Sequence, residues 1–211
     1  MIRLLLVDDH PVVRAGYQRL LEQAGDMRVV AQAGRVDEAI AAFAQQAPDV
    51  TVTDLSMPGS GGLELIRRVL ARAPGARVLV FSMHDSAMLV ARAFDLGARG
   101  FLTKSSAPES LLDAVRRVHA GQRYLSPELP AHLLQGTPPG GALDSLTARE
   151  FEIFRLLARG ESIAACALAL KLSPKTVSNH QTLIKEKLGV GTSAALAHLA
   201  IRHGVIAADG L

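Results

Sequence analysis

The chain opens with the apolar run IRLLLV (Ile2–Val7), which is followed directly by Asp8 and Asp9. Three later apolar runs end in the same way: residues 50–53 precede Asp54, residues 78–81 precede Ser82, and residues 101–103 precede Lys104. Short apolar runs of this kind are typical of buried strands in a parallel sheet. Because ligand groups gather at the carboxyl ends of such strands, we expect these polar side chains to meet on one edge of the sheet, here called the carboxyl rim.

The first 120 residues alternate strand signals with amphipathic stretches of helical spacing. We expect strands at 2–7, 28–33, 50–53, 77–81 and 100–102, and helices near 11–24, 36–46, 62–72, 86–96 and 108–119. This alternation implies a parallel sheet with right-handed crossovers and helices on both faces. The sequence therefore predicts a doubly wound, five-stranded α/β domain over residues 1–120.

Prolines and glycines cluster in residues 121–145, which predicts a linker between two domains. The part at 126–134 is expected to hold a short helix, because Pro127 suits a first-turn position after Ser126. The stretch 136–142 is expected to be the flexible part of the linker.

After the linker the strand signals stop and helical spacing takes over. The first helix is entered through a capping box formed by Thr147 and Glu150, and Gly160 ends it. Further helices are expected at about 162–170, 174–188 and 193–203. This pattern predicts an all-α, four-helix domain with a helix-turn-helix over residues 146–211.

The composition is that of an ordinary globular protein, with 49% hydrophobic and 20% charged residues. A single cysteine, Cys166, favours a reducing cytoplasm, and neither a secretion signal nor a membrane span is indicated. A net charge of +3 is too small to argue for nucleic acid by itself, but residues 171–187 carry four lysines against Glu186 alone. Clustered positive charge in the last domain modestly favours a nucleic-acid partner.

The carboxylates of Asp8, Asp9 and Asp54 are hard oxygen ligands of the kind that Mg²⁺ prefers. Three nearby carboxylates without a cation would repel one another, so we expect a bound divalent ion to neutralise them. A carboxylate is also a nucleophile toward phosphorus, and Asp54 has the best position, alone at the end of the central strand. The sequence therefore predicts a magnesium-assisted phosphoryl-transfer site.

Ser82 and Lys104 are suited to donate hydrogen bonds to phosphoryl oxygens. The glycine-rich loop 55–62, directly after Asp54, is suited to a tight turn that exposes backbone groups to an ion or phosphate. Each of these residues taken alone has a simpler interpretation, as a helix cap, a turn residue or a solvated lysine. Their coincidence at the ends of four strands favours a site.

At these residues the first 120 positions resemble the receiver domain of bacterial two-component response regulators. The matching stretches are Leu6–His10, Asp54–Gly59, Val80–Ser82 and Gly97–Lys104. The resemblance implies a flavodoxin-like sheet in the strand order 2-1-3-4-5. It also implies that Asp54 accepts phosphate from a sensor histidine kinase.

The same resemblance implies a ligand set for Mg²⁺: Asp9, Asp54 and the backbone carbonyl of Ser56, with Asp8 acting mainly through water. Ser82 and Lys104 would contact the phosphoryl group. Phe101 matches an aromatic position that turns inward when the hydroxyl residue moves toward the phosphate. From sequence alone, a core phenylalanine on the fifth strand is an equally good interpretation of Phe101.

Residues 146–203 resemble the LuxR-type helix-turn-helix, which places the chain in the NarL/FixJ class of response regulators. The matching stretches are Leu146–Glu150, Gly160, Leu170–Ser173, Lys175–His180 and Ile184–Gly189. Because short polar side chains reach base edges from a helix in the major groove, the first part of helix 174–188 is the candidate DNA reader. The DNA-binding candidates are Lys175, Thr176, Ser178, Asn179, His180, Thr182 and Lys185.

Among these candidates, Ser178, Asn179 and Thr182 are expected at bases, while Lys175, His180 and Lys185 are expected at phosphates. On the same helix, Val177, Leu183 and Leu188 are expected in the core. The stretch 162–170 departs from the family, since it is apolar where polar and basic residues are usual. We interpret Cys166 there as a packing residue, and the missing phosphate contacts leave a protein contact as an alternative role for this helix.

The sequence thus predicts a phosphorylation-controlled transcription regulator whose partners are a sensor kinase, promoter DNA and a second copy of the chain. No separate substrate is expected, because Asp54 would gain and lose phosphate within the domain itself. Two alternatives stay open: a phosphatase or phosphotransferase acting on small molecules through an aspartyl intermediate, and an interaction module that no longer binds DNA. The adjacent Asp8 and Asp9 and the absence of a cap insertion speak against the first alternative.

Overall fold

The computed structural model describes residues 1–57, 61–83, 85, 87–131, 133, 142–170, 172–203 and 205–206. The chain divides into two compact units, Met1–Thr137 and Pro138–Leu211. The predicted flexible stretch 136–142 lies outside the described residues except for its last position, and the predicted helix 126–134 lies partly outside them. Within the described ranges, no helix is both long enough and apolar enough to cross a bilayer.

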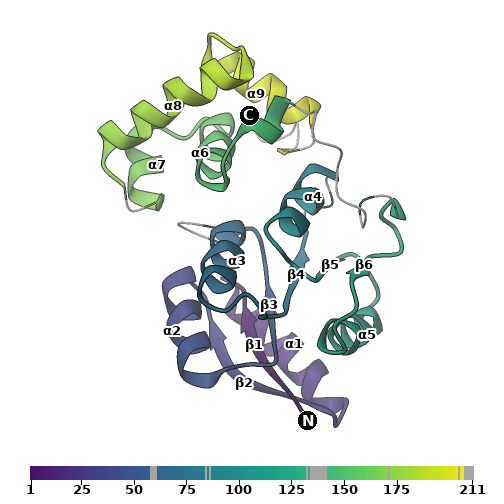
Figure 1. The fold of residues 1–211 in the computed structure, drawn as a ribbon. Helices are drawn as coiled ribbons and strands as arrows, with labels where there is room; N and C mark the ends of the chain where they lie inside the picture. The colour runs from purple at the N-terminus through teal and green to yellow at the C-terminus, as the bar shows by residue number, and fades with distance from the viewer. Residues whose placement is uncertain are drawn as a thin grey trace. The chain divides into compact units, whose positions relative to one another are not determined.

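The first unit is built on a parallel sheet of six strands in the order β2-β1-β3-β4-β5-β6. The strands are β1 (Ile2–Val7), β2 (Met27–Ala33), β3 (Val50–Thr53), β4 (Val78–Ser82), β5 (Gly100–Thr103) and β6 (Tyr124–Leu125). The order of the first five strands is the predicted one. Figure 1 shows β1 and β3 side by side inside the sheet, each with a strand on either side.

The sixth strand corrects the predicted strand count. β6 lies within the stretch interpreted as linker, and it pairs Tyr124 with Gly100 and Leu125 with Phe101. Tyr124 is buried and belongs to the main apolar core of the unit. A strand of two residues has no periodicity to detect, so only its partner strand reveals it.

Helices cover both faces of the sheet, as the alternating sequence predicts. They are α1 (Pro11–Gln23), α2 (Val36–Gln46), α3 (Gly61–Arg72), α4 (Ala87–Asp95) and α5 (Pro108–His119). α1 neighbours α5 on one side, whereas α3 neighbours both α2 and α4 on the other (Figure 1). Proline in the first turn of α1 and of α5 costs no hydrogen bond, because those N–H groups have no partner inside the helix.

The second unit consists of helices in its described part. A short 3₁₀ turn (Ala142–Ser145) precedes α6 (Ala148–Ala158), α7 (Ile163–Leu170), α8 (Pro174–Leu188) and α9 (Ser193–Arg202). The capping box at the start of α6 is confirmed: Thr147 Oγ1 accepts from Glu150 N at 3.2 Å, and Glu150 Oε2 accepts from Thr147 N at 2.7 Å. Gly189, with φ +64°, ends α8 in the left-handed conformation that favours glycine.

The core of the second unit differs from the sequence expectation at one position of α8. Val177 and Leu188 are buried as predicted, but Leu183 is 45% exposed and Ile184 is fully buried instead. Adjacent helical residues point about 100° apart, so an error of one residue in the phase moves a side chain from the core to the surface. Cys166 is buried, in agreement with its interpretation as a packing residue.

Candidate functional site

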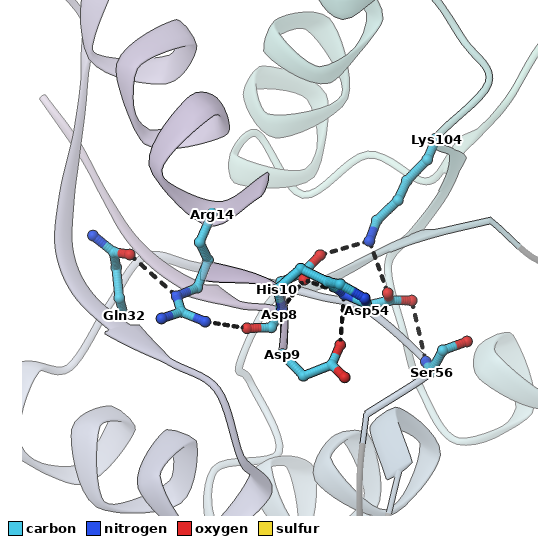
Figure 2. Close-up of polar contacts among 8 residues, drawn as sticks. All are labelled: Asp8, Asp9, His10, Arg14, Gln32, Asp54, Ser56 and Lys104. Atoms are coloured by element: carbon cyan, nitrogen blue, oxygen red, sulfur yellow. Dashed lines mark hydrogen bonds and ion pairs between the residues drawn. The ribbon is translucent and has the colours of Figure 1, made fainter. Parts of the chain in front are cut away.

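The carboxyl rim brings three predicted residues into direct contact through one ammonium group. Lys104, which follows β5, donates from Nζ to Asp8 Oδ2 at 2.5 Å and to Asp54 Oδ2 at 2.7 Å (Figure 2). All three side chains are exposed by 8% or less. The parallel register explains the meeting, because Asp8 and Asp54 follow the adjacent strands β1 and β3, and Asp54 N donates to Val7 O at 2.9 Å.

The electrostatics of the rim favour an ionised Asp54. Burial would raise the pKa of Asp54, but the hydrogen bond and charge of Lys104, with bonds from Ser56 N–H and from Ser82, hold it below its ordinary value. Burial would likewise lower the pKa of Lys104, but its bonds to Asp54 and Asp8 raise it instead. Asp54 is therefore an anion at neutral pH.

Asp9 and its neighbours decide whether the rim suits a metal ion. Asp9 Oδ1 is buried and accepts no hydrogen bond among the described residues. His10 Nδ1 lies 3.0 Å from it, an ion-pair distance without hydrogen-bond alignment, and 3.3 Å from Asp8 Oδ1. One ligand atom from each of Asp8, Asp9 and His10 lies within 4.8 Å of the others. A buried oxygen lacking a hydrogen-bond donor, beside the Asp8 carboxylate and the His10 ring, fits a hard divalent cation.

Ser82 lies on β4, the neighbour of β3, and Phe101 lies on β5, one strand further out. Ser82 is fully buried at the end of β4, and its hydrogen bond contributes to the lowered pKa of Asp54. Lys104 N donates to Ser82 O at 2.8 Å, so the backbone ties the hydroxyl residue to the lysine. Phe101 on β5 is 0% exposed, the position expected of a core residue and also of an aromatic side chain turned inward.

Gly62 lies directly against the backbone of Asp54. A Cβ at this position would stand 2.1 Å from the Asp54 carbonyl oxygen and 2.7 Å from Leu55 Cα. Gly62 N also donates to Leu55 O at 3.0 Å. Only glycine therefore permits this close approach of α3 to the end of β3.

A group of hydroxyl side chains beside Lys104 was not predicted. Ser126 Oγ, just after β6, accepts from Thr103 N at 2.8 Å, and Thr103 Oγ1 lies 2.8 Å from Ser106 Oγ. Ser106 in turn donates to Glu128 Oε2 at 3.2 Å. These contacts join the end of β5 to a segment more than 20 positions later, so local sequence patterns carry no signal for them.

Arg14 on α1 is a second neighbour of the rim that sequence reasoning missed. Its Nη1 donates to the backbone carbonyl oxygen of Asp8, and its Nε donates to Gln32 Oε1 on β2 at 3.2 Å (Figure 2). The contact is visible only once β2 and α1 are placed beside β1.

On α8 the candidate DNA-binding residues form a largely exposed surface. Lys175, Ser178, Asn179 and Thr182 are exposed, while Thr176, His180 and Lys185 are half-buried. Thr182 Oγ1 donates to Ser178 O at 3.2 Å, which fixes its rotamer within the helix. The positive charge of Lys187 is paired with Glu150, because its Nζ lies 2.7 and 2.8 Å from the two Glu150 carboxylate oxygens.

α7 is as apolar in the structure as in the sequence. It carries no charged side chain, and its Leu168 is 84% exposed. Cys166, Ala167 and Leu170 face the core. The helix thus offers the second unit packing but no charged phosphate contact.

Two family models match the chain, one for each unit. Residues 4–116 match the response regulator receiver domain, and residues 144–200 match the bacterial regulatory proteins of the luxR family. These are regulators and not small-molecule phosphatases, which removes the first alternative left open by the sequence.

Similar proteins match along nearly their whole length. The transcriptional activator protein ExaE of Pseudomonas putida is 42% identical over 96% of this chain and 97% of its own. The response regulator UvrY of Escherichia coli K12 is 34% identical over 100% and 99%. Among solved structures, RcsB of Salmonella enterica serovar Typhimurium bound to promoter rprA with the phosphomimetic BeF₃⁻ is 29% identical, with a TM-score of 0.68 over 94% and 98%.

The same family is indicated by the parallel sheet with its acidic residues and lysine on the carboxyl rim, by the helix-turn-helix unit and by the full-length relatives. The chain belongs to the two-component response regulators of the NarL/FixJ class, DNA-binding transcription regulators with a receiver domain and a LuxR-type helix-turn-helix.

Proposed function

We propose that Asp54 accepts a phosphoryl group from the phosphohistidine of a sensor histidine kinase, and that Mg²⁺ assists the transfer. The observation that carries the proposal is the nearly buried Lys104 ammonium in contact with both Asp8 and Asp54. Such a cation fixes the Asp54 carboxylate and offers a donor for the incoming phosphoryl oxygens. The buried Asp9 oxygen, which accepts no hydrogen bond among the described residues, supports a metal at the same rim.

In the transfer, an Asp54 carboxylate oxygen attacks phosphorus while the phosphorus–nitrogen bond to the kinase histidine breaks and the imidazole keeps the electron pair. The lowered pKa keeps Asp54 ionised for this attack. Lys104 and Ser82 then donate hydrogen bonds to the phosphoryl oxygens. Mg²⁺, when bound, neutralises phosphoryl charge, and Asp9, Asp54 and the Ser56 carbonyl would hold it, with Asp8 acting through water.

Phosphorylation at Asp54 would change the surface of the receiver domain through Ser82 and Phe101. The phosphoryl group adds negative charge and acceptor oxygens close to the Ser82 hydroxyl. Drawing Ser82 toward it favours the state in which the neighbouring Phe101 is turned inward, as its full burial allows. We infer that this state favours a homodimer, whose two reading helices match paired half-sites.

The second domain, residues 146–211, would bind promoter DNA through α8. The exposed Ser178, Asn179 and Thr182 are suited to base edges, and Lys175, His180 and Lys185 to phosphates, with Thr176 close to the backbone. RcsB, whose structure was solved on promoter DNA, supports this by its likeness along both domains. A protein that meets bacterial promoter DNA works in the cytoplasm, which is the location we infer.

The phosphoacceptor is tested with acetyl phosphate and Mg²⁺ on the full chain, followed by intact mass. Wild type is expected to gain one phosphoryl mass and Asp54→Asn none, because an amide is not a nucleophile toward phosphorus. The matched control is Asp113→Asn, which removes an exposed carboxylate of α5 that pairs with Arg117. This variant should leave phosphorylation unchanged. Phosphoryl mass on Asp54→Asn would overturn the assignment.

A further inference from the structure

In the described contacts, Arg14 touches the backbone of the carboxyl rim and none of its three carboxylates. Its guanidinium Nη1 donates to the carbonyl oxygen of Asp8, and its Nε donates to Gln32 Oε1 at 3.2 Å. We propose that Arg14 is a positioning residue that fixes the peptide between Asp8 and Asp9 and so aims the Asp9 carboxylate at the metal. This inference rests on the proposed role of Asp9 as a metal ligand.

Arg14 binds the carbonyl of the peptide group that joins Asp8 to Asp9. On its near side, Asp8 N donates to Ala33 O at 3.1 Å, so β2 already fixes the amide before it. The carbonyl of Asp8 lies beyond the last paired position of β1, Val7 with Ala33. Arg14 supplies the bond for that carbonyl, and with it the orientation of the plane that carries Asp9 N.

Asp9 depends on this plane, because little else among the described contacts holds its side chain. The Asp9 side chain is 22% exposed, yet its buried Oδ1 accepts no hydrogen bond there. Its close neighbour His10 is 65% exposed, and the His10 Nδ1 is shared between Asp9 Oδ1 at 3.0 Å and Asp8 Oδ1 at 3.3 Å. A carboxylate whose backbone is fixed and whose oxygen accepts no hydrogen bond is suited to bind a cation. Groups that orient metal ligands strongly affect the affinity for the metal.

The guanidinium is itself oriented by a chain of amides on α1 and β2. Gln32 Nε2 donates to Gln18 Oε1 at 2.7 Å, and Gln18 Nε2 lies 3.2 and 3.3 Å from the Glu22 carboxylate oxygens. A planar guanidinium serves two acceptors at fixed angles, which a lysine ammonium at this position does not reproduce.

The test measures Mg²⁺ affinity by calorimetry on the unphosphorylated full chain, separately from phosphorylation. Arg14→Gln and Arg14→Lys are both expected to raise the Mg²⁺ dissociation constant about tenfold, the low end for loss of a residue that orients a metal ligand. Phosphorylation by acetyl phosphate should fall at limiting Mg²⁺ and recover at saturating Mg²⁺. The matched control is Arg19→Gln, which removes the same charge from an exposed position of α1 and should change neither quantity.

The outcomes separate this inference from the proposed function. Unchanged Mg²⁺ affinity in both Arg14 variants overturns the inference, and so does full recovery by Arg14→Lys, which would make charge and not the planar fork decisive. A lower melting temperature in EDTA with unchanged Mg²⁺ affinity would also overturn it, since it indicates a merely structural role. Unchanged affinity in Asp9→Asn and Asp54→Asn would instead refute the proposed metal site itself.

Discussion

The carboxyl rim and the exposed surface of α8 are both polar, but they are built in opposite ways. On the rim, Asp8, Asp54 and Lys104 are nearly buried and bonded to one another. On α8, Ser178 and Asn179 stand exposed on a helix held from its other face by Val177 and Ile184. A substitution on the rim must therefore disturb folding and chemistry together, whereas a substitution on α8 should change only what the helix binds.

The largest effect is expected for Lys104→Met, which removes the cation between two buried carboxylates. Breaking a buried ion pair by removing one partner costs about 3–5 kcal/mol, so the free energy of unfolding at pH 7 should fall by that order. Urea unfolding of the receiver domain within the full chain measures it. A loss below about 1 kcal/mol would show that the rim tolerates its charges as well as an exposed surface does.

The pH dependence of the free energy of unfolding should also differ between wild type and Lys104→Met. In wild type the folded pKa of Asp54 lies below its unfolded value, so its contribution to stability is present above the unfolded pKa and is lost as acid carries the pH down through the folded pKa. The folded pKa of Lys104 is raised, so its contribution holds below its unfolded pKa and is lost as pH rises through the folded one. Without Lys104, burial should raise the pKa of Asp54, and the acid-side loss should shrink or reverse.

The next effect is expected for Gly62→Ala. Since a Cβ would stand 2.1 Å from the Asp54 carbonyl oxygen, α3 or the end of β3 must shift, and we expect a loss of about 3 kcal/mol with slower phosphorylation. The control is Gly16→Ala in α1, where a Cβ meets nothing within 4 Å and alanine should stabilise the helix slightly. Equal urea midpoints for the two variants would contradict the close packing at Gly62.

The smallest effect on stability, and the sharpest contrast with the rim, is expected for Asn179→Ala. Because Asn179 is exposed, the free energy of unfolding should change by less than about 0.5 kcal/mol. Loss of a base contact should weaken binding to the preferred promoter by about 1–3 kcal/mol, measured by fluorescence anisotropy. Lys175→Ala should instead weaken binding to all sequences and lower the salt slope by about 1.

The rim was the most predictable part of the molecule, because strand ends are marked by local sequence. Asp8, Asp54 and Lys104 directly follow their strands, Ser82 is the last residue of β4, and the parallel order places them together. Their chemical roles, and those of the α8 residues, stay predictions. Leu183 was the less predictable case, because an error of one residue in the helical phase moves a side chain from the core to the surface.

Contacts between different helices and strands carried no signal in the sequence. Arg14 meets Asp8 only after α1 folds back on β1, and Ser126 meets Thr103 only when β6 joins the sheet. Both contacts use a backbone group as one partner, so neither depends on a recognisable pair of side chains. Local patterns therefore predicted the strand ends and missed the residues that support them.

β6 has one further consequence, for the outer edge of the sheet. Tyr124 N donates to Arg99 O at 3.0 Å, Ser126 N to Phe101 O at 2.9 Å, and Thr103 N to Ser126 Oγ at 2.8 Å. These bonds occupy the backbone groups that β5 would otherwise offer to a strand of another molecule. A receiver fragment cut at residue 120 would expose that edge and invite edge-to-edge aggregation, whereas one that keeps Ser126 carries its own protection.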